Sequence, residues 1–275
     1  MAAIRFIAGP PSIRRIAVNN LIQWPTAKYW EKAWNPMVGC RPCSPACEHC
    51  YANAISNRFK MGNFSEPRET LDQRPPRSGV VFCGNMTDLF GEWMYDFTDP
   101  SVLIEHTLGY SHKAKYLWLT KRPDNMCDAL NRGVLNYQDE DGEHQSPFFD
   151  CEFSNQYFGF TAENQEWYEK RFELFFRYKP LWTQCWLSAE PLLGPIDLRI
   201  GKFPIAEVPF KWVVVGCESG PKRRPCKIEW VESIVNQCMR NIVPVFVKQL
   251  DIDGKCVTDI TQFPKHLQIR QIPWR

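Results

Sequence analysis

Four cysteines lie within eleven residues near the N-terminal end of the chain: Cys40, Cys43, Cys47 and Cys50. Cys47 and Cys50 form a C-x2-C pair, which Cys43 extends to C-x3-C-x2-C and Cys40 extends to C-x6-C-x2-C. Thiolates this close in sequence can ligate an iron–sulfur cluster or a structural zinc ion, or can work as a redox pair.

An iron–sulfur cluster is the interpretation that this spacing favours. A compact run of cysteines in one loop can wrap such a cluster, and three ligands to a four-iron cube would leave one iron open. Structural zinc usually takes four ligands from two separated pairs, and no second C-x2-C or H-x3-H pair follows in the sequence. A redox pair needs only two cysteines in a thioredoxin-like context. Zinc and redox-active cysteines remain alternatives. His49 lies between Cys47 and Cys50, a position from which it could not easily ligate the same metal as both cysteines.

The composition is that of a globular protein with two unusual counts. The 275 residues are 44% hydrophobic and 23% charged, which excludes a disordered, collagen-like or coiled-coil chain. A net charge of +2 excludes a global polycation that would coat nucleic acid. The unusual counts are 12 Cys and 11 Trp. Most of the tryptophans are expected in the core, and most of the cysteines outside the four-cysteine loop are expected to be small buried residues. Those cysteines are Cys83, Cys127, Cys151, Cys185, Cys217, Cys226, Cys238 and Cys256.

We expect a soluble, cytoplasmic protein. The first 20 residues are interrupted by Pro and Arg and do not form a signal peptide. The apolar runs fall short of the roughly 18–20 residues that a membrane span needs. Clustered cysteines in a reducing compartment indicate ligation of a metal or cofactor more than disulfides.

Six short apolar runs predict a parallel sheet. They are continuous in Val, Phe and Trp without alternation, which suits strands that are covered on both faces, and their spacing leaves room for crossover helices. The runs are residues 79–83, 116–119, 157–160, 184–188, 212–216 and 243–247. Expected helices are residues 52–61, 100–112, 163–177 and 229–240. Residues 136–146 and 198–211 are expected to be surface insertions, and residues 1–275 a single α/β domain.

Polar residues follow the end of every predicted strand. In a β/α barrel the carboxyl ends of the strands meet at one face and build the active site. The segments are residues 84–88, 120–123, 161–164, 189–191, 217–220 and 248–249. Taken as a set, they predict one shared cavity.

An ordered set of motifs resembles the phage family named after gene products 37 and 68, a radical-SAM-like group. The resemblance covers roughly residues 34 to 250. Its motifs are Trp34-Asn35-Pro36 with Gly39-Cys40, Ser44-Pro45-Ala46-Cys47 with Cys50-Tyr51-Ala52, residues 85–90 (NMTDLF), 119–123 (LTKRP), 159–164 (GFTAEN), 188–196 (SAEPLLGPI), 216–220 (GCESG) with Arg224-Pro225, and Val247-Lys248-Gln249. The sequence departs from the family's pattern at the extra Cys43, at Ala46 in place of Gly and at Asn85 in place of Ser.

This resemblance implies an incomplete (β/α)6 barrel of the radical SAM type with parallel strands. It also implies a [4Fe–4S] cluster and S-adenosylmethionine (SAM), whose reductive cleavage gives methionine and a 5′-deoxyadenosyl radical. Cys47 and Cys50 are ligands under either spacing. Family resemblance favours Cys40 as the third ligand and the superfamily spacing favours Cys43, so both remain candidates.

The resemblance also gives roles to the strand-end residues. Asp88 follows the second strand, counting one before the cysteine loop, and is expected to accept from the methionine ammonium or to cap a helix. Lys121 and Arg122 are expected to pair with the SAM carboxylate or a substrate phosphate, Glu163 and Asn164 to bind the ribose, and Glu218 and Ser219 to lie near the adenine or the substrate. The candidate catalytic residues are Lys121, Glu190 and Lys248. The remaining candidate cofactor contacts are Tyr51, which would shield the cluster, Asn85, Thr87, Thr120, Thr161 and Ser188.

The resemblance implies an enzyme that acts on a phage nucleotide or DNA base, for example by isomerising a thymine-attached group. A flavodoxin or ferredoxin is expected as reductant, and a three-Cys-motif protein is a further expected partner. The alternatives are a zinc- or cluster-stabilised nucleic-acid-binding protein and a DNA photoproduct repair enzyme. Residues 222–227, with four cations, form a candidate nucleic-acid patch whose alternative is a solvated loop.

Overall fold

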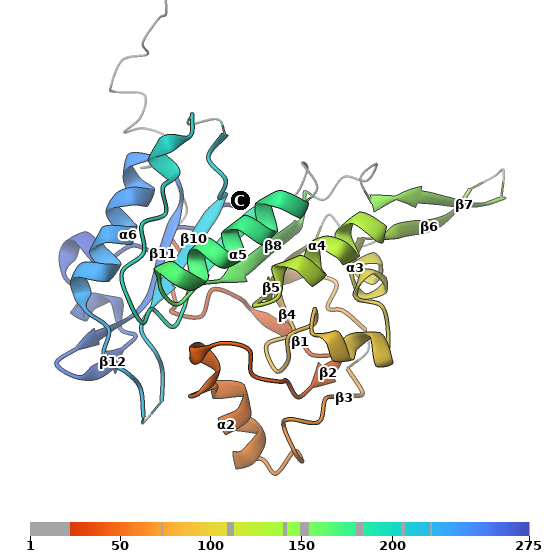
Figure 1. Cartoon of the computed structure of the whole chain (residues 1–275), viewed down its shortest axis with the longest axis horizontal. Helices are drawn as coiled ribbons and strands as arrows, with labels where there is room; N and C mark the ends of the chain where they lie inside the picture. The colour runs from red at the N-terminus through yellow and green to blue at the C-terminus, as the bar shows by residue number, and fades with distance from the viewer. Residues whose placement is uncertain are drawn as a thin grey trace, which may run out of the picture.

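The computed structural model describes residues 23–72, 74–108, 113–139, 142–148, 154–179, 184–204, 207–220 and 222–274. Its centre is a curled sheet of eight strands in the order β1-β4-β5-β8-β9-β10-β11-β12 (Figure 1). The first seven strands are mutually parallel, and β12 pairs antiparallel with β11. These strands are β1 Lys32–Trp34, β4 Gly79–Cys83, β5 Ala114–Thr120, β8 Gln156–Thr161, β9 Cys185–Ala189, β10 Trp212–Gly216, β11 Val245–Ile252 and β12 Lys255–Val257.

All six predicted strands are present, and the predicted α/β class with a parallel, barrel-like sheet is confirmed. The expected count of six is too low, because the sheet has seven parallel strands and one antiparallel strand. β1 is the strand before the cysteine loop that the resemblance implies, and β12 is the strand that was not expected; each has three residues. Strands this short do not produce a recognisable apolar run.

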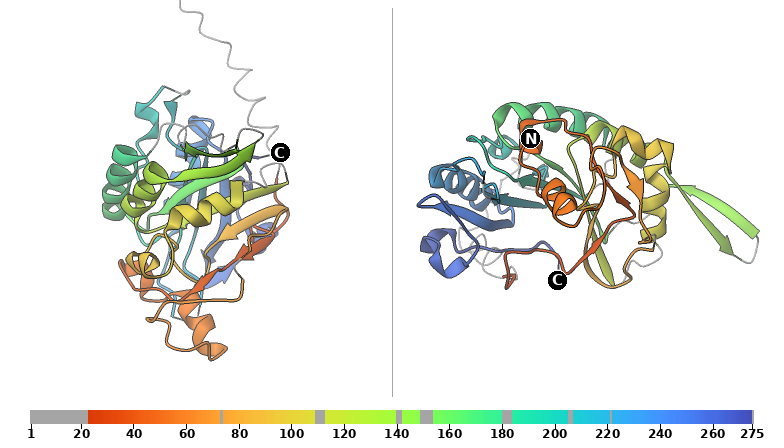
Figure 2. Two further views of the ribbon diagram at one scale, coloured as in Figure 1. Left: turned by 90° about the vertical axis from the view of Figure 1, so that its right-hand side faces the viewer. Right: turned by 90° about the horizontal axis from the view of Figure 1, so that it is seen from below.

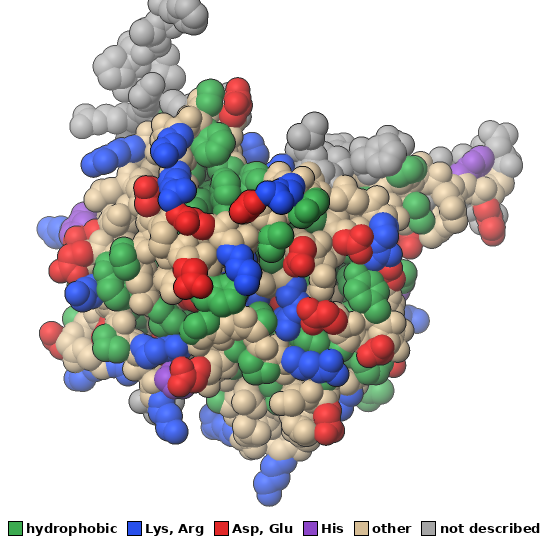
Figure 3. Space-filling model, in the orientation of Figure 1, with side chains coloured by type: hydrophobic (Ala, Val, Ile, Leu, Met, Phe, Trp, Pro, Cys, Tyr) green, Lys and Arg blue, Asp and Glu red, His purple; other side chains and the backbone are tan. Residues whose placement is uncertain are grey.

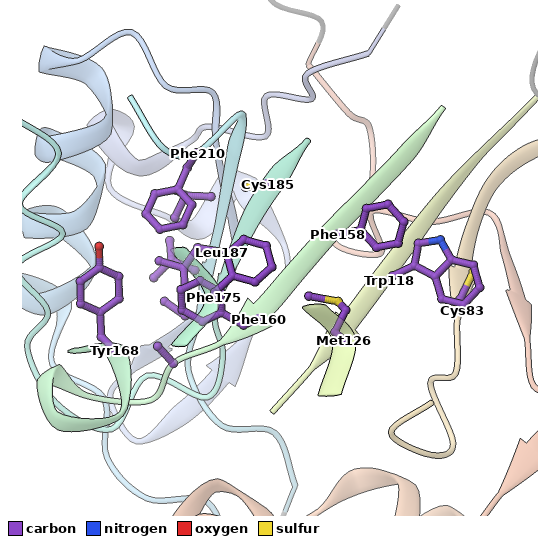
Figure 4. Packing of buried hydrophobic residues seen from close by; sticks show 14 of the residues in the cluster. Cys83, Trp118, Met126, Phe158, Phe160, Tyr168, Phe175, Cys185, Leu187 and Phe210 are labelled. Atoms are coloured by element: carbon purple, nitrogen blue, oxygen red, sulfur yellow. The ribbon is translucent and has the colours of Figure 1, made fainter. Parts of the chain in front are cut away.

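Both faces of the sheet are buried, which explains why the strands read as continuous apolar runs. Val213 and Val215 belong to the larger core, whereas Trp212 and Val214 belong to a second core on the opposite face. In the larger core the Trp118 and Phe158 rings are stacked with centroids 6.2 Å apart (Figure 4). Five tryptophans in the described residues are completely buried, as expected for the core.

All helices but the first, which follows the cysteine loop and lies beyond the sheet, cover one face of the curled sheet (Figures 1 and 2). The helices are α2 Tyr51–Arg58, α3 Pro100–Leu108, α4 Pro123–Arg132, α5 Gln165–Tyr178 and α6 Ile228–Arg240. Four of them match predicted helices, except that residues 109–112 lie outside the described residues. The predicted start of α5 at residue 163 is two residues early, because the Asn164 side chain accepts from the Trp167 N–H and caps the helix. Sequence reasoning missed α4, which begins at Pro123, a residue suited to the first helical turn.

The insertions and short elements lie outside the main sheet. The described part of the predicted surface insertion at residues 136–146 belongs to a hairpin of β6 Val134–Asp139 and β7 Gly142–Pro147, which projects from the body in Figures 1 and 2. A second pair joins β2 Met37–Val38 to β3 Arg68–Glu69. Short 3-10 helices occur at Pro45–Cys47, Glu92–Asp96, Ile200–Lys202, Ile260–Gln262 and Lys265–Leu267. The helices within the described residues are too short or too polar to span a bilayer.

The remaining cysteines are buried as expected. Cys83, Cys127, Cys185, Cys217, Cys226 and Cys238 are buried, Cys256 is half-buried, and Cys151 lies outside the described residues. The parallel register places the carboxyl ends of neighbouring strands level with one another: Thr120 pairs with Phe160, and Thr161 with Ser188. The polar segments that follow these strands therefore meet at one edge of the sheet.

Candidate functional site

A cavity of about 440 Å³ opens at the carboxyl ends of the parallel strands. Its wall combines the cysteine loop, residues 39–50, with the segments that follow β4, β5, β9 and β10, the last residue of β8, and Lys248 and Gln249. The predicted strand end at residues 248–249 is too early, because β11 continues to Ile252. Every predicted site residue lines this cavity except Glu163 and Asn164. The topology thus brings together predicted site residues that are up to 208 positions apart in sequence, from Cys40 to Lys248.

The start of the cysteine loop is fixed by close backbone packing. Gly39 has a φ of +105°, and a Cβ there would lie 2.9 Å from the Pro67 Cα. The Cys40 N–H donates to the Phe64 carbonyl at 2.8 Å, and the Thr87 hydroxyl donates to the Gly39 carbonyl at 2.5 Å. Only glycine meets both the steric and the conformational demand at position 39. Thr87 therefore positions the loop from the neighbouring strand end.

The end of the loop is tied to the same segment through Tyr51. Its phenol donates to the Asn85 carbonyl at 2.7 Å. The Asn85 side-chain oxygen is buried and has no hydrogen-bond partner among the described residues. A buried polar atom without a partner is rare in folded proteins, and this one belongs to a residue of the cavity wall.

The four thiols of the loop are free and half-buried. A hydrogen bond between the Cys43 and Cys47 side chains lowers the pKa of Cys47 to about 4 and raises that of Cys43, while burial raises the pKa of Cys40 to about 12. In the described part of the chain, no three His, Cys, Asp or Glu side chains already surround a common metal position. The four thiols are the soft donors that an iron–sulfur cluster takes.

Asp88 and Arg122 brace the loop against the end of β5. The Asp88 carboxylate accepts from the Thr120 hydroxyl at 2.7 Å, from the Lys121 N–H at 3.0 Å and from the Arg122 guanidinium at 3.3 Å. Arg122 also donates to the Arg41 carbonyl of the cysteine loop at 3.0 Å. Both side chains are buried at the cavity wall and already hold protein partners.

The Lys121 side chain is a cation on the thiol side of the cavity. Burial opposes its charge, but the nearby Cys47 sulfur and Glu163 outweigh burial and raise its pKa. Lys121 therefore stays protonated and suits an anionic partner such as a thiolate or a bound carboxylate.

Glu163 and Asn164 lie behind the wall. Glu163 is completely buried and accepts from Arg171 at 2.6 Å, and Arg171 also donates to the Thr161 carbonyl at 2.8 Å and the Lys121 carbonyl at 3.2 Å. This ion pair joins the ends of β5 and β8. Asn164 caps α5, so both residues position cavity residues from outside the cavity.

Glu190, which follows β9, and Lys248, on β11, form an ion pair on the cavity wall. The Lys248 ammonium lies 2.9 Å from a Glu190 carboxylate oxygen, and the Tyr29 hydroxyl donates to the other oxygen at 3.4 Å. Ser188 lies 3.5 Å from that same oxygen. The ammonium also lies 5.8 Å from the Tyr29 and Trp30 ring centroids. Two aromatic rings and an ion pair thus form one region of the wall.

The loop after β10 contacts the cysteine loop through hydrogen bonds of Glu218 and Arg224. Glu218 is buried. Its carboxylate forms a hydrogen bond with His49 Nδ1 at 3.0 Å and accepts from Arg224 Nε at 3.0 Å. Arg224 also donates to the Pro45 carbonyl at 3.0 Å. Ser219, the next residue, is exposed at the rim. His49 is therefore a structural link to Glu218.

The predicted basic patch at residues 222–227 contributes Arg224 to these contacts with the cysteine loop. Arg224 forms ion pairs with Glu218 and with Glu48, the latter at 3.3 Å. On the face shown in Figure 3, Lys and Arg side chains are interspersed with Asp and Glu. That face therefore presents no continuous basic surface.

Sequence reasoning missed five residues of this site. Tyr29 and Trp30 precede the first strand, and His49 and Arg224 act through partners far away in the sequence. Arg171 lies inside a helix behind the wall. The sequence signals were the Arg224-Pro225 motif within the basic patch and a Tyr-Trp pair just before a short strand, which resembles ordinary core aromatics.

The Glu218 contacts predict a pH-dependent contribution to stability. Burial raises the pKa of Glu218, but the hydrogen bonds from Arg224 and His49 outweigh it and hold the pKa below the ordinary 4.5. A carboxylate with a lowered pKa in the folded state stabilises the fold above pH 4.5 and loses that contribution as the pH falls through the folded-state pKa. In urea unfolding, Glu218→Gln is expected to be less stable than the parent at neutral pH and to converge with it in acid. Glu48→Gln is the control: the Glu48 carboxylate is exposed, so its replacement is expected to change the free energy of unfolding little. Parallel pH profiles of the parent and Glu218→Gln would contradict this role.

Comparison with known proteins gives one family. Neither a search of curated proteins nor a search of solved structures finds a match to this chain. The family described as "protein of unknown function (DUF5131)" matches residues 24–262, a span that includes the cysteine loop and every segment of the cavity wall. The chain therefore belongs to the DUF5131 family.

Proposed function

We propose that this chain is a radical SAM enzyme that holds a [4Fe–4S] cluster on its cysteine loop and binds SAM in the adjoining cavity. The observation that carries the proposal is the position of four free, half-buried thiols on the wall of a cavity at the carboxyl ends of a parallel sheet. A volume of about 440 Å³ lies within the roughly 300–1,000 Å³ of small-molecule sites.

Cys47, Cys50 and either Cys40 or Cys43 would hold the cluster. A cluster held there would supply the electron for reductive cleavage of SAM. The protein contributes ligation, orientation and exclusion of water. The protonated Lys121 is suited to balance the negative charge that several thiolates bring to this end of the cavity.

The contacts of the wall refine the roles proposed for SAM recognition. The Asp88 oxygens already accept from Thr120, Lys121 and Arg122, whereas the Asn85 side-chain oxygen is buried without a partner. We therefore assign the methionine ammonium to Asn85 and the carboxylate to Lys121. Asp88 and Arg122 would then act by holding the loop in place.

The remaining polar wall suits the nucleoside and the substrate. Thr161 and Ser188 offer hydroxyls for the ribose, and Glu218 with Ser219 would contact the adenine or the substrate, while Glu163 and Asn164 support this wall from behind. Beyond them, Glu190 and Lys248 present an acceptor beside a donor, next to the Trp30 ring. This combination of ring face and paired charges supports a nucleotide or DNA base as substrate, with Glu190 and Lys248 as catalytic candidates and a flavodoxin- or ferredoxin-like reductant.

Anaerobic reconstitution tests this proposal. The parent chain is expected to take up about four irons, as one cube requires, and to release 5′-deoxyadenosine from SAM when a reductant is added. Mass spectrometry measures the nucleoside, and metal analysis measures iron and zinc. The matched control is Cys226→Ala, which removes a buried cysteine outside the loop and is expected to keep both properties. A colourless protein with one zinc and no SAM cleavage would instead support the zinc-stabilised binding protein.

A further inference from the structure

A second pair of cysteines lies away from the four-cysteine loop, with one member, Cys217, on the cavity wall. The Cys217 and Cys256 sulfurs are 3.8 Å apart. Cys217 directly follows β10 and lines the cavity, and Cys256 lies on the edge strand β12. The proposed cluster and SAM contacts use neither thiol.

We propose that Cys217 and Cys256 form a redox-active dithiol that exchanges electrons with small disulfides and closes to a reversible disulfide bond. The S–S bond needs a separation of about 2.05 Å, so the sulfurs must approach from 3.8 Å. β12 is well placed to allow this approach: it has three residues, pairs with β11 on one side only and follows the two-residue turn Asp253-Gly254. Both turn residues have positive φ, 49° and 70°, as a tight hairpin requires.

The two thiols differ in access and in their charged neighbours. Cys256 is half-buried and Cys217 is buried. The hydrogen bond from Cys217 lowers the pKa of Cys256, and the nearby cations Arg223 and Lys248 lower it further, whereas burial and Asp251 act in the opposite direction. The same hydrogen bond raises the pKa of Cys217. Cys256 is thus the accessible nucleophile and Cys217 the resolving thiol.

The exchange takes place in two steps with a disulfide such as oxidised glutathione as oxidant. The Cys256 thiol loses its proton, and its thiolate attacks one glutathione sulfur; the glutathione S–S bond breaks, and one glutathione leaves as a thiolate that takes up a proton. Cys217 then gives up its proton and attacks the Cys256 sulfur of the mixed disulfide, which releases the second glutathione. Two electrons and two protons pass from the cysteine pair to the oxidant, and one Cys217–Cys256 bond forms.

Peptide mapping of the full chain tests this assignment. The reduced protein is treated with oxidised glutathione, free thiols are blocked with N-ethylmaleimide, and the digest is analysed by mass spectrometry. We expect a peptide that links Cys217 to Cys256 and only transient glutathione on Cys256. Cys217→Ala is expected to leave Cys256 as a stable mixed disulfide, at least tenfold more abundant than in the parent. In Cys256→Ala, the link is lost and the buried Cys217 stays reduced.

The buried neighbour Cys226 provides the matched control. Cys226→Ala is expected to keep the Cys217–Cys256 link, and thermal unfolding of each variant checks that it is folded. The assignment is overturned if the parent itself accumulates glutathione on Cys256, if Cys256 is unreactive, or if the link joins Cys226 instead. Should a variant fail to fold, the time course in the parent chain alone tests the same two steps, because the mixed disulfide must form before the link. None of these measurements involves iron or SAM, so they are independent of the proposed radical chemistry.

Discussion

Replacing Cys47 or Cys50 by alanine is expected to abolish iron binding by the reconstituted protein and, with it, the cleavage of SAM. These two cysteines are ligands under both spacings that the loop offers, C-x3-C-x2-C and C-x6-C-x2-C. A cube that depends on three thiolates does not survive the loss of one in a solvent-accessible loop. Both side chains are half-buried, so their truncation is expected to leave the fold intact.

The measurements are iron and sulfide per chain, together with 5′-deoxyadenosine formed after reduction. Circular dichroism and thermal unfolding establish that each variant is folded, and Cys226→Ala reports the effect of losing a cysteine elsewhere. Retention of about four irons by Cys47→Ala would remove the loop from consideration as the cluster site, because one cube holds four. Loss of iron in every variant, Cys226→Ala included, would point to a general loss of stability.

The same experiment assigns the third ligand. Cys43 shares a hydrogen bond with Cys47, which places the two sulfurs together but leaves the Cys43 thiol protonated. Burial raises the pKa of Cys40, so this thiol is also protonated and must lose its proton before it can bind iron. Both must lose a proton to act as ligands. Because the proposed cluster takes three thiolates and Cys47 and Cys50 supply two, we expect only one of Cys40→Ala and Cys43→Ala to abolish iron uptake.

The main sheet was predictable because its signal is strong and local. A strand such as β10, Trp212–Gly216, is covered on both faces and reads as an unbroken apolar run. The cavity followed from topology alone, since parallel strands bring their carboxyl ends to one edge. The short strands β1 and β12 and the hairpin β6–β7 carry no such run, and their pairing depends on neighbours far away in sequence.

The contacts that hold the site together were not predictable from spacing. Tyr29 reaches Glu190 across 161 positions, and Arg224 reaches Pro45 across 179. Asp88 could be predicted as a polar strand-end residue, but sequence does not reveal that Thr120 and Arg122 occupy its oxygens. Whether a polar side chain is left for a ligand or is used by the fold is decided by tertiary packing.

Arg171→Leu is expected to destabilise the chain by about 3–5 kcal/mol, because it leaves the Glu163 carboxylate buried without its counter-ion. Glu163 is fully buried and Arg171 is 1% exposed, so solvent offers no compensation. The guanidinium also satisfies the carbonyls of Thr161 and Lys121, which would lose a donor each. Urea unfolding of parent and variant measures the difference in the free energy of unfolding.

The double variant Glu163→Gln/Arg171→Leu separates the charge from the packing. Removing both charges is expected to recover part of the loss, since an unpaired buried charge costs more than a missing pair. A third variant, Arg177→Leu, is the matched control on the same helix, because its partner Glu173 is exposed and the pair is expected to contribute little. A loss below about 1 kcal/mol in Arg171→Leu would mean that the carboxylate takes up a proton or finds another partner at little cost. Because Arg171 joins the backbone after β5 to the end of β8, the single variant is also expected to loosen Lys121 and Thr161 on the cavity wall, so that any SAM cleavage falls in a chain that still binds iron.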